Sequence, residues 1–294
     1  MGLVISVVIP TRNRATQLKR ALDALLQDEY PHTELIVCDG ASVDGTVELL
    51  KSYGEAVRWV SEPDEGEYDA RNKGLLMATG EVIKYMSDDD ELVPGTLAFG
   101  ADYFRRHPDV DILFGQSVWF DARSGHQPVV CDTRLRTEES IRARNFIRQS
   151  KPLVPSETAF FRRSVVEQLG FFNPEYTGAD YEYWVRAAKA GCRLAISERV
   201  FVHYHISDLS GVERKRVRLL FGLLRLARAY GAPSDIVYLL FAIPFRLCVR
   251  AVYTVLHPLG VFPELLWARW KTRRRPSGPA VPVNRADREV GSDG

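Results

Sequence analysis

Short apolar runs alternate with helix-like segments through the first third of the chain. The strand-like runs are Leu3–Ile9, Glu34–Cys38, Val57–Val60 and Glu81–Met86. The helix-like segments between them are Ala15–Gln27, Val43–Tyr53 and Tyr68–Ala78. In the first, apolar residues recur at the spacing of one helix face, and the capping residues Ser42 and Asp44 open the second. Strands that alternate with helices usually pair in parallel through right-handed crossovers. The pattern therefore predicts an α/β fold with a mostly parallel central sheet.

The pattern is looser beyond Pro94. It predicts a helix over Gly95–His107, a strand over Ile112–Trp119 and a helix over Asp180–Ala190. The segment Val212–Arg275 is rich in Leu, Arg and aromatic residues, and we expect amphipathic helices there. Its longest uncharged apolar run has ten residues, whereas a membrane-spanning helix needs roughly 20. The remainder, 276–294, is rich in Pro, Gly and charge and is predicted to be disordered.

Charge divides the chain into two parts. The formal net charge is +1, yet Val212–Arg275 holds 13 Lys and Arg against three carboxylates, so the rest of the chain is net acidic. A basic end on an acidic body fits binding to an anionic surface, such as membrane lipid or nucleic acid. The four cysteines form no CxxC pair, which argues against a zinc ribbon and fits a reducing cytosol. We expect the apolar N-terminus to be a first strand rather than a signal peptide.

Polar residues cluster where the predicted strands end. The clusters are Thr11–Arg14, Asp39–Asp44, Glu62–Tyr68 and Ser87–Asp90. In parallel α/β sheets, ligands bind beyond the carboxyl ends of the strands. The sequence therefore predicts a ligand site built from these clusters.

Three adjacent carboxylates, Asp88–Asp90, follow the fourth strand directly. They repel one another unless a cation offsets their charge, and Mg²⁺ and Mn²⁺ prefer oxygen ligands while leaving positions open for phosphate. The alternative is a solvated acidic turn before the next helix. The position at a strand end favours the metal site.

Asp39 ends the second strand and precedes Gly40. A carboxylate there can accept the N–H of a nucleotide base, although an Asx-turn or a helix cap would use the same residue types. The first turn, PTRNR, contains no glycine, and no GxxxxGK[ST] loop occurs in the chain. These absences argue against a dinucleotide-binding oxidoreductase and a P-loop enzyme.

Four segments together resemble the family-two inverting glycosyltransferases of the GT-A fold. They are ISVVIPTRNR, LIVCDGASVDGT, EPDEGEYDARNKGLLMATGEVIKYMSDDDELVP and GADYEYWVRAAKAG, spread over roughly the first 205 residues. The resemblance implies a nucleotide-sugar donor, a divalent cation (Mn²⁺ or Mg²⁺) and inversion at the anomeric carbon. It implies that the nucleoside is held by Thr11, Asp39 and Arg71, and the ribose by Asp88. It implies that the metal is held by the acidic motif, where Asp89 is the expected ligand and Asp88 and Asp90 are further candidates. Separately from the resemblance, His205 lies on a predicted strand and could reach the diphosphate or the metal.

The resemblance also implies that Asp180 is the general base. An acceptor hydroxyl must lose its proton as it attacks opposite the leaving diphosphate, and one carboxylate can take that proton. The alternative is that Asp180 only caps the helix that follows. Trp184 could stack on an acceptor sugar, although a core aromatic is the more common role, and Glu157 is a weak candidate for the acceptor pocket. A structural histidine is likewise the alternative at His205.

The sequence thus predicts a GT-A-like nucleotide-binding sandwich with a C-terminal helical appendage. We expect residues 1–211 to form the catalytic domain, with a nucleotide-binding half at 1–93 and an acceptor-binding half at 94–211. Residues 212–275 are predicted to form a basic amphipathic helical region, followed by the tail.

The expected function is inverting, metal-dependent transfer of one sugar to a glycan or lipid-linked acceptor. A UDP- or dTDP-sugar is favoured because Asp39 with Arg71 suits a pyrimidine base, and the chain lacks the QxxRW motif of processive relatives. We expect a cytoplasmic enzyme in surface polysaccharide or glycolipid synthesis, held peripherally on the inner membrane face and not on nucleic acid. The basic region could instead fold onto the catalytic domain or a homodimer partner. The alternative functions are a nucleotidyltransferase and a catalytically inactive binding module.

Overall fold

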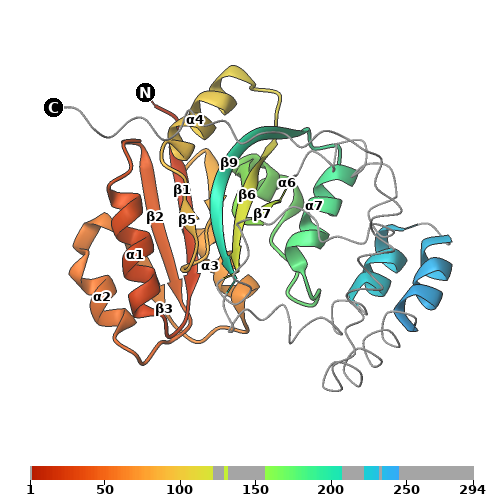
Figure 1. The fold of residues 1–294 in the computed structure, drawn as a ribbon, viewed down its shortest axis with the longest axis horizontal. Helices are drawn as coiled ribbons and strands as arrows, with labels where there is room; N and C mark the ends of the chain where they lie inside the picture. Colours follow the sequence, from red (N-terminus) through yellow and green to blue (C-terminus); the bar gives the residue numbers. More distant parts are fainter. Residues whose placement is uncertain (1, 122–128, 132–155, 207–221, 232–233, 245–294) are drawn as a thin grey trace. The chain divides into compact units, whose positions relative to one another are not determined.

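A computed structural model describes residues 2–121, 129–131, 156–206, 222–231 and 234–244. Its strands form one nine-stranded sheet in the order β3-β2-β1-β4-β8-β6-β9-β5, with β7 paired to β6 (Figure 1). The strands are β1 (Ile5–Thr11), β2 (Thr33–Asp39), β3 (Arg58–Ser61), β4 (Val82–Tyr85), β5 (Glu91–Leu92), β6 (Ile112–Asp121), β7 (Val129–Cys131), β8 (Ala159–Arg162) and β9 (Leu194–Ile206). The helices are α1 (Ala15–Leu26), α2 (Thr46–Ser52), η1 (Gly54–Ala56), α3 (Glu67–Met77), α4 (Thr96–Arg106), η3 (Ser156–Thr158), α6 (Arg163–Leu169) and α7 (Ala179–Lys189).

The first four strands confirm the predicted α/β pattern. β3, β2, β1 and β4 pair in parallel, and helices connect them in sequence. Helix α2 begins at Thr46, three residues later than predicted, because Gly45 takes a left-handed conformation with φ of 93°. Asp44 accepts from the Thr46 amide at 3.2 Å and from the Ala15 amide of α1 at 3.0 Å.

The second half of the sheet is mixed. Strand β8 was not predicted, and it inserts antiparallel between β4 and β6. Strands β6 and β9 are parallel to each other, and the two-residue β5 pairs antiparallel with β9. The predicted helices at 95–107 and 180–190 and the strand at 112–119 are present with small shifts in their ends.

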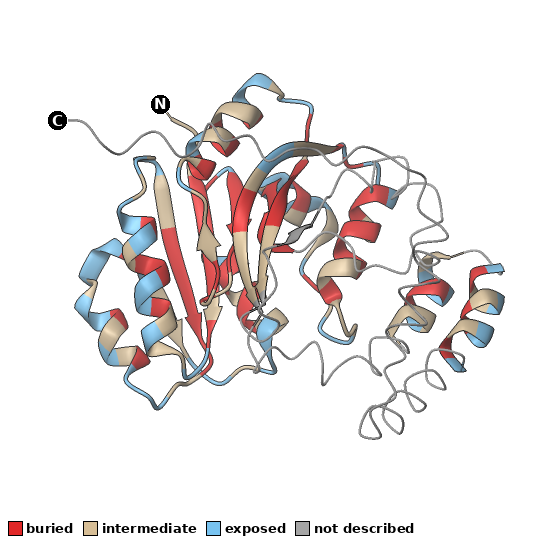
Figure 2. Ribbon diagram, in the orientation of Figure 1, coloured by how far each residue is buried: buried red, intermediate tan, exposed pale blue. Residues whose placement is uncertain are grey.

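Buried residues lie along the strands of the sheet and on the helices beside them (Figure 2). The buried apolar side chains form two clusters, one on each face of the sheet. Neighbouring residues of a strand point to opposite faces, so Val8 packs with residues of α3 and α7, whereas Val7 packs with residues of α1 and α4. Trp184 is 1% exposed, and its ring meets Phe114 edge-on with a centroid separation of 5.3 Å. It is therefore a core aromatic and has no face free to stack on a sugar.

The parallel strands end at one edge of the sheet. In their register Thr11 pairs with Asp39, and Asp39 pairs with Ser61. The Met86 amide continues the ladder by donating to the Val8 carbonyl at 3.1 Å, so the chain after β4 emerges at this same edge. The polar clusters predicted from the sequence are gathered here.

Only part of the predicted basic helical region is described. Residues 222–230 and 234–244 are helical, while the rest of 212–275 and the predicted tail lie outside the described residues. Met1–Phe241 forms one compact unit, and Ala242–Gly294 is assigned to a second. None of the helices in the described part of the chain has the length and apolar character that a membrane-spanning helix needs.

Two adjacent leucines on α3 allow a test of how much the buried face of this helix contributes to the stability of the fold. Leu75 is 6% exposed in the core, whereas Leu76 is 72% exposed. We expect Leu75→Ala to lower the free energy of unfolding by about 2–5 kcal/mol, because it removes buried atoms and leaves a cavity. Leu76→Ala, the matched control, should change it by no more than about 0.5 kcal/mol. Urea denaturation followed by circular dichroism measures both, and equal effects would contradict the packing of α3.

Candidate active site

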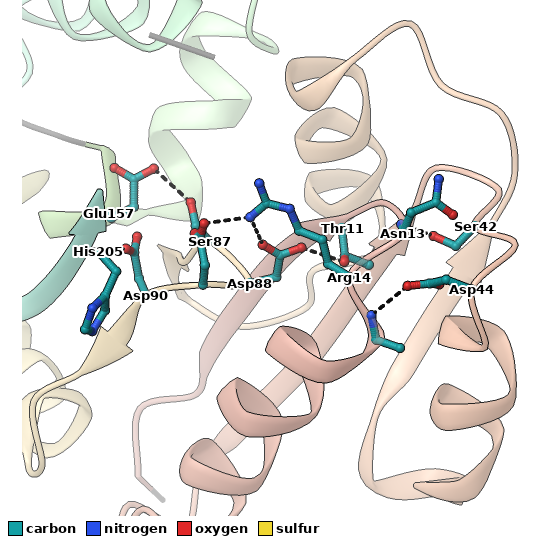
Figure 3. Close-up of polar contacts among 12 residues, drawn as sticks. Thr11, Asn13, Arg14, Ser42, Asp44, Ser87, Asp88, Asp90, Glu157 and His205 are labelled. Carbon is teal, nitrogen blue, oxygen red and sulfur yellow. Dashed lines mark hydrogen bonds and ion pairs between the residues drawn. The ribbon is translucent and has the colours of Figure 1, made fainter. Parts of the chain in front are cut away.

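Arg14 contacts two carboxylates of the segment Asp88–Asp90, called the acidic segment below (Figure 3). Its Nη1 atom lies 2.6 Å from Asp89 Oδ2 and 3.1 Å from Asp88 Oδ1. Thr11 Oγ1 donates to the other oxygen of Asp88 at 2.7 Å. The structure thus brings Thr11, Asp88 and Asp89 together as expected. Sequence reasoning missed Arg14, although two arginines directly after the first strand were a signal that a cation faces the acids.

Burial raises the pKa of two of the three acids in this segment. It raises the pKa of Asp88 to about 6, even though Thr11 and Arg14 favour the charged form. Asp90 is 2% exposed, and burial, together with the charges of Glu157 and Asp89, raises its pKa well above the usual range. Its Oδ1 accepts weakly from the His205 amide at 3.4 Å, and its Oδ2 has no hydrogen-bond partner among the described residues. Burial therefore works against the charged form of both acids, and a bound cation would favour that form.

The predicted metal ligands do not all meet at one point. No group of three or more His, Cys, Asp and Glu side chains is arranged to hold a metal within the described ranges. The His205 Nε2 atom lies 3.7 Å from Glu91 Oε1, and its ring stacks on Phe120. Its metal role stays a prediction.

The acidic segment itself nevertheless fits a divalent cation. Mg²⁺ is commonly held by only one or two carboxylates, with substrate phosphates and water as its other ligands. Asp89 offers one partly exposed carboxylate, and the unpartnered Asp90 Oδ2 is a second hard oxygen. Asp89 and Asp90 would hold the cation, and Arg14 now interacts with the first of them.

Asp39 is held in place by two serines. Its carboxylate accepts from the Ser42 amide at 3.0 Å, from the Ser42 hydroxyl, and from Ser61 Oγ at 2.6 Å. Next to it, a Cβ atom on Gly40 would come 2.3 Å from Asp64 Oδ2, so only glycine fits there without a shift of Asp64. The edge of β2 thus presents a fixed, buried carboxylate, as binding of a base would require.

Arg71 does not contact Asp39. It is 2% exposed, and its Nη2 atom lies 2.8 Å from Glu157 Oε1 and 2.6 Å from Glu67 Oε1. Its guanidinium lies 5.0 Å from the ring centroid of Tyr85. The Nε and Nη1 atoms of Arg71 have no hydrogen-bond partner in the described part of the chain. The predicted contact of Arg71 with the nucleoside stays a prediction, and the structure places this side chain beside Glu157 instead.

Lys84 is a second buried cation near the acids. Its Nζ atom donates to the Tyr85 carbonyl at 2.9 Å and to the Glu157 carbonyl. Burial lowers its pKa to about 7, while the negative charges of Glu157 and Asp90 act in the opposite direction. Glu157 thus lies between two buried cations, a more central position than its sequence context indicated.

Asp180 is held by hydrogen bonds to both carboxylate oxygens. Tyr68 Oη donates to Oδ1 at 2.8 Å, and Ser156 Oγ donates to Oδ2 at 3.0 Å. The N-cap residue of α7 is Gly178, which makes no side-chain cap, so Asp180 is not the capping residue. Its carboxylate is instead oriented by residues of α3 and η3. Nothing in the sequence near Asp180 indicated these two partners.

Polar contacts connect the acidic segment to Asp180. Ser87 Oγ lies 3.5 Å from Glu157 Oε1, which accepts from Arg71 at 2.8 Å. The Arg71 guanidinium lies 5.7 Å from the ring centroid of Tyr68, whose hydroxyl reaches Asp180. These contacts link Asp180 to Ser87, the residue directly before the acidic segment.

Comparisons with known proteins identify the family of this chain. The model of the family described as glycosyl transferase family 2 matches residues 6–170, more than half of the chain. "Glycosyltransferase AglE" of Haloferax volcanii is 26% identical over 73% of this chain and 71% of its own length. A "PGL/p-HBAD biosynthesis glycosyltransferase" of Mycobacterium bovis is 28% identical over 62% of this chain and 69% of its own.

Solved structures share the fold. A mannosyltransferase, PcManGT from Pyrobaculum calidifontis in complex with GDP-Man and Mn²⁺, matches with a TM-score of 0.63 at 23% identity, over 93% of this chain and 80% of that one. Residues 1–349 of TarS from S. aureus, in complex with UDP-GlcNAc, match with a TM-score of 0.60 at 17% identity, over 81% and 72%. These matches confirm the predicted GT-A fold. Because the family model matches more than half of this chain, the chain belongs to glycosyl transferase family 2.

Proposed function

We propose that this glycosyltransferase is an inverting, metal-dependent and non-processive enzyme that moves one sugar from a nucleotide-sugar to an acceptor hydroxyl. The observation that carries the proposal is the set of contacts from Ser87 through Glu157, Arg71 and Tyr68 to Asp180. These contacts support the proposal because they link the fixed carboxylate of Asp180 to the residue that directly precedes the acidic segment. Family membership disfavours nucleotidyl transfer. The presence of Asp39, Asp89 and Asp180 together speaks against an inactive binding module.

The proposed donor is a UDP- or dTDP-sugar. Asp39 would accept the N–H of a pyrimidine base, because its carboxylate is already fixed by Ser42 and Ser61. Thr11 and Asp88 would lie against the ribose. The neighbours in complex with GDP-Man and with UDP-GlcNAc support a nucleotide-sugar donor in general, and they differ in the base.

Asp180 would take the proton from the acceptor hydroxyl. Its two hydrogen bonds leave further lone pairs on both oxygens, so the carboxylate can still accept from an incoming hydroxyl. A Mn²⁺ or Mg²⁺ ion bound at Asp89 would neutralise charge on the departing diphosphate. General-base assistance of this kind contributes about 10²–10⁴ in rate.

The proposed acceptor is a glycan or a lipid-linked sugar, reached from the cytoplasmic face of the membrane. Val237, Leu240 and Phe241 are 54%, 56% and 76% exposed, and their spacing places them on one helix face. Arg246 and Arg250 follow in the sequence. Exposed apolar side chains close to basic residues favour an interfacial helix on anionic lipid, and a homodimer contact through the same side chains is the alternative.

Replacement of the proposed base tests the mechanism. We expect Asp180→Asn to lower kcat by about 10²-fold or more, because the amide cannot take a proton. Binding of the nucleoside diphosphate, measured by calorimetry, should stay unchanged. Turnover is followed as nucleoside diphosphate released from a panel of UDP-, dTDP- and GDP-sugars with a lipid extract as acceptor. The control is Glu167→Gln, which alters an exposed carboxylate of α6. Turnover close to that of the wild type in Asp180→Asn would overturn the assignment.

Two substitutions should change Mn²⁺ affinity in opposite directions. Asp89→Asn removes a proposed ligand, so we expect Mn²⁺ to bind about tenfold or more weakly. Arg14→Gln removes a cation that lies 2.6 Å from Asp89, so we expect tighter binding in the absence of nucleotide. Electron paramagnetic resonance of free Mn²⁺ measures both.

The matched control for the metal experiment is Asp102→Asn, which alters a carboxylate exposed on α4. It should leave Mn²⁺ affinity unchanged. Equal Mn²⁺ affinity in the wild type, Asp89→Asn and Arg14→Gln would place the metal site elsewhere.

Charge placed on the exposed apolar helix face tests the membrane role. We expect the double substitution Leu240→Glu with Phe241→Glu to abolish sedimentation with anionic liposomes, because it removes apolar contact and adds repulsion. Leu76→Glu, at an equally exposed leucine of α3, is the control and should sediment as the wild type does. Assays at low and high salt separate apolar from electrostatic binding. Wild-type protein that never sediments would refute the membrane role.

A further inference from the structure

Tyr68 connects the nucleotide-binding half of the proposed site to Asp180, the proposed general base. It lies at the start of α3, which packs on β1 and β2, and its hydroxyl donates to Asp180 across 112 residues of sequence. The loop before α3 follows Ser61, which binds Asp39. The Tyr68 side chain thus joins α3, which lies close to Asp39, to α7, which carries Asp180.

The Tyr68 ring is fixed on both sides. It stacks on Phe172 with a centroid separation of 6.0 Å and an interplanar angle of 28°. The Arg71 guanidinium lies 5.7 Å from its centroid. Burial, together with the negative charge of Asp180, raises the pKa of the phenol well above its usual value. The hydroxyl therefore remains protonated and serves as a permanent donor.

We propose that Tyr68 is a positioning residue that, with Ser156, fixes the carboxylate plane of Asp180 for attack by the acceptor; this rests on the proposed role of Asp180 as the base. A carboxylate bonded at only one oxygen can still rotate about its Cβ–Cγ bond, whereas donors at both oxygens hold it in one orientation. Orientation of this kind contributes to rate because the reacting atoms are held close to the geometry of the transition state.

The charged groups around this pair are already engaged with each other. Glu67 and Arg71 of α3 are paired, and Arg71 also pairs with Glu157 of η3. Removal of the Tyr68 hydroxyl therefore leaves those ion pairs in place and takes away one donor from Asp180. This makes Tyr68→Phe a specific probe of the contact.

The chain contains a closely matched control for that probe. Tyr183 of α7 also stacks on Phe172, at 4.4 Å and 28°, and it is buried, but its hydroxyl has no hydrogen-bond partner within the described part of the chain. Tyr68→Phe and Tyr183→Phe remove the same atom from two rings that share a neighbour. Only the first touches Asp180.

We expect Tyr68→Phe to lower kcat by about 10- to 100-fold, the range for a lost hydrogen bond to a charged group. The KM for the donor and the calorimetric Kd for UDP should stay within about twofold of the wild type. Tyr183→Phe should leave kcat, KM and Kd unchanged, and Ser156→Ala should lower kcat in the same direction as Tyr68→Phe. Thermal unfolding confirms that each variant is folded before kinetics are compared.

A double substitution separates positioning from a general structural effect. If Tyr68 acts through Asp180, Tyr68→Phe in the Asp180→Asn background should cause no further loss of kcat. A full additional loss in that background, or an unchanged kcat in Tyr68→Phe alone, would overturn the inference. Full activity of Asp180→Asn alone would instead overturn the proposed function, so the two failures are distinguishable.

Discussion

Carboxylates crowd at the carboxyl ends of the parallel strands, and the fold must offset their mutual repulsion to keep them there. Asp88 and Asp90 are buried, and an unpaired ion in such surroundings costs several kcal/mol. Cations from three elements lie in this cluster. Arg14 after β1 pairs with Asp88, and the charge of Lys84 in β4 acts on Asp90. Arg71 in α3 pairs with Glu157, whose charge also acts on Asp90. The raised pKa values of the two acids show that this compensation is incomplete. The proposed divalent cation would supply further positive charge at this point.

The same edge of the sheet explains how distant residues meet. Thr11 and Asp88 are 77 positions apart and bond at 2.7 Å, because β1 and β4 are parallel neighbours that end together. Asp39 joins them because β2 lies on the other side of β1. The proposed base, Asp180, reaches the site from a different direction, at the first turn of α7. The sheet therefore builds the donor side directly, while the acceptor side depends on contacts between helices.

This difference sets what could be predicted from the sequence. The parallel strands have strong local patterns in the sequence. Once these strands were predicted, Thr11, Asp39 and the acidic segment could be placed at their carboxyl ends. Strand β8 escaped prediction because its four residues show no periodicity that separates a strand from a loop. The contacts of Arg14 and of Tyr68 are set by tertiary packing, which no local pattern encodes. The burial of Arg71 also depends on tertiary packing. No local pattern indicated it, because a charged helix residue is usually exposed.

Helix α3 is the element on which the two sides of the site depend together. A Cβ atom on Gly74 would come 2.2 Å from Val8 Cγ1, so the helix lies against β1 at a distance that only glycine allows without a shift. This close contact fixes the axis of α3, and with it the positions of Tyr68 and Arg71 one turn apart near its start. Arg71 then offsets Glu157 beneath the acidic segment, while Tyr68 orients Asp180. Because both side chains are on one rigid helix, the charge balance of the donor side and the orientation of the proposed base are set by the same packing contact.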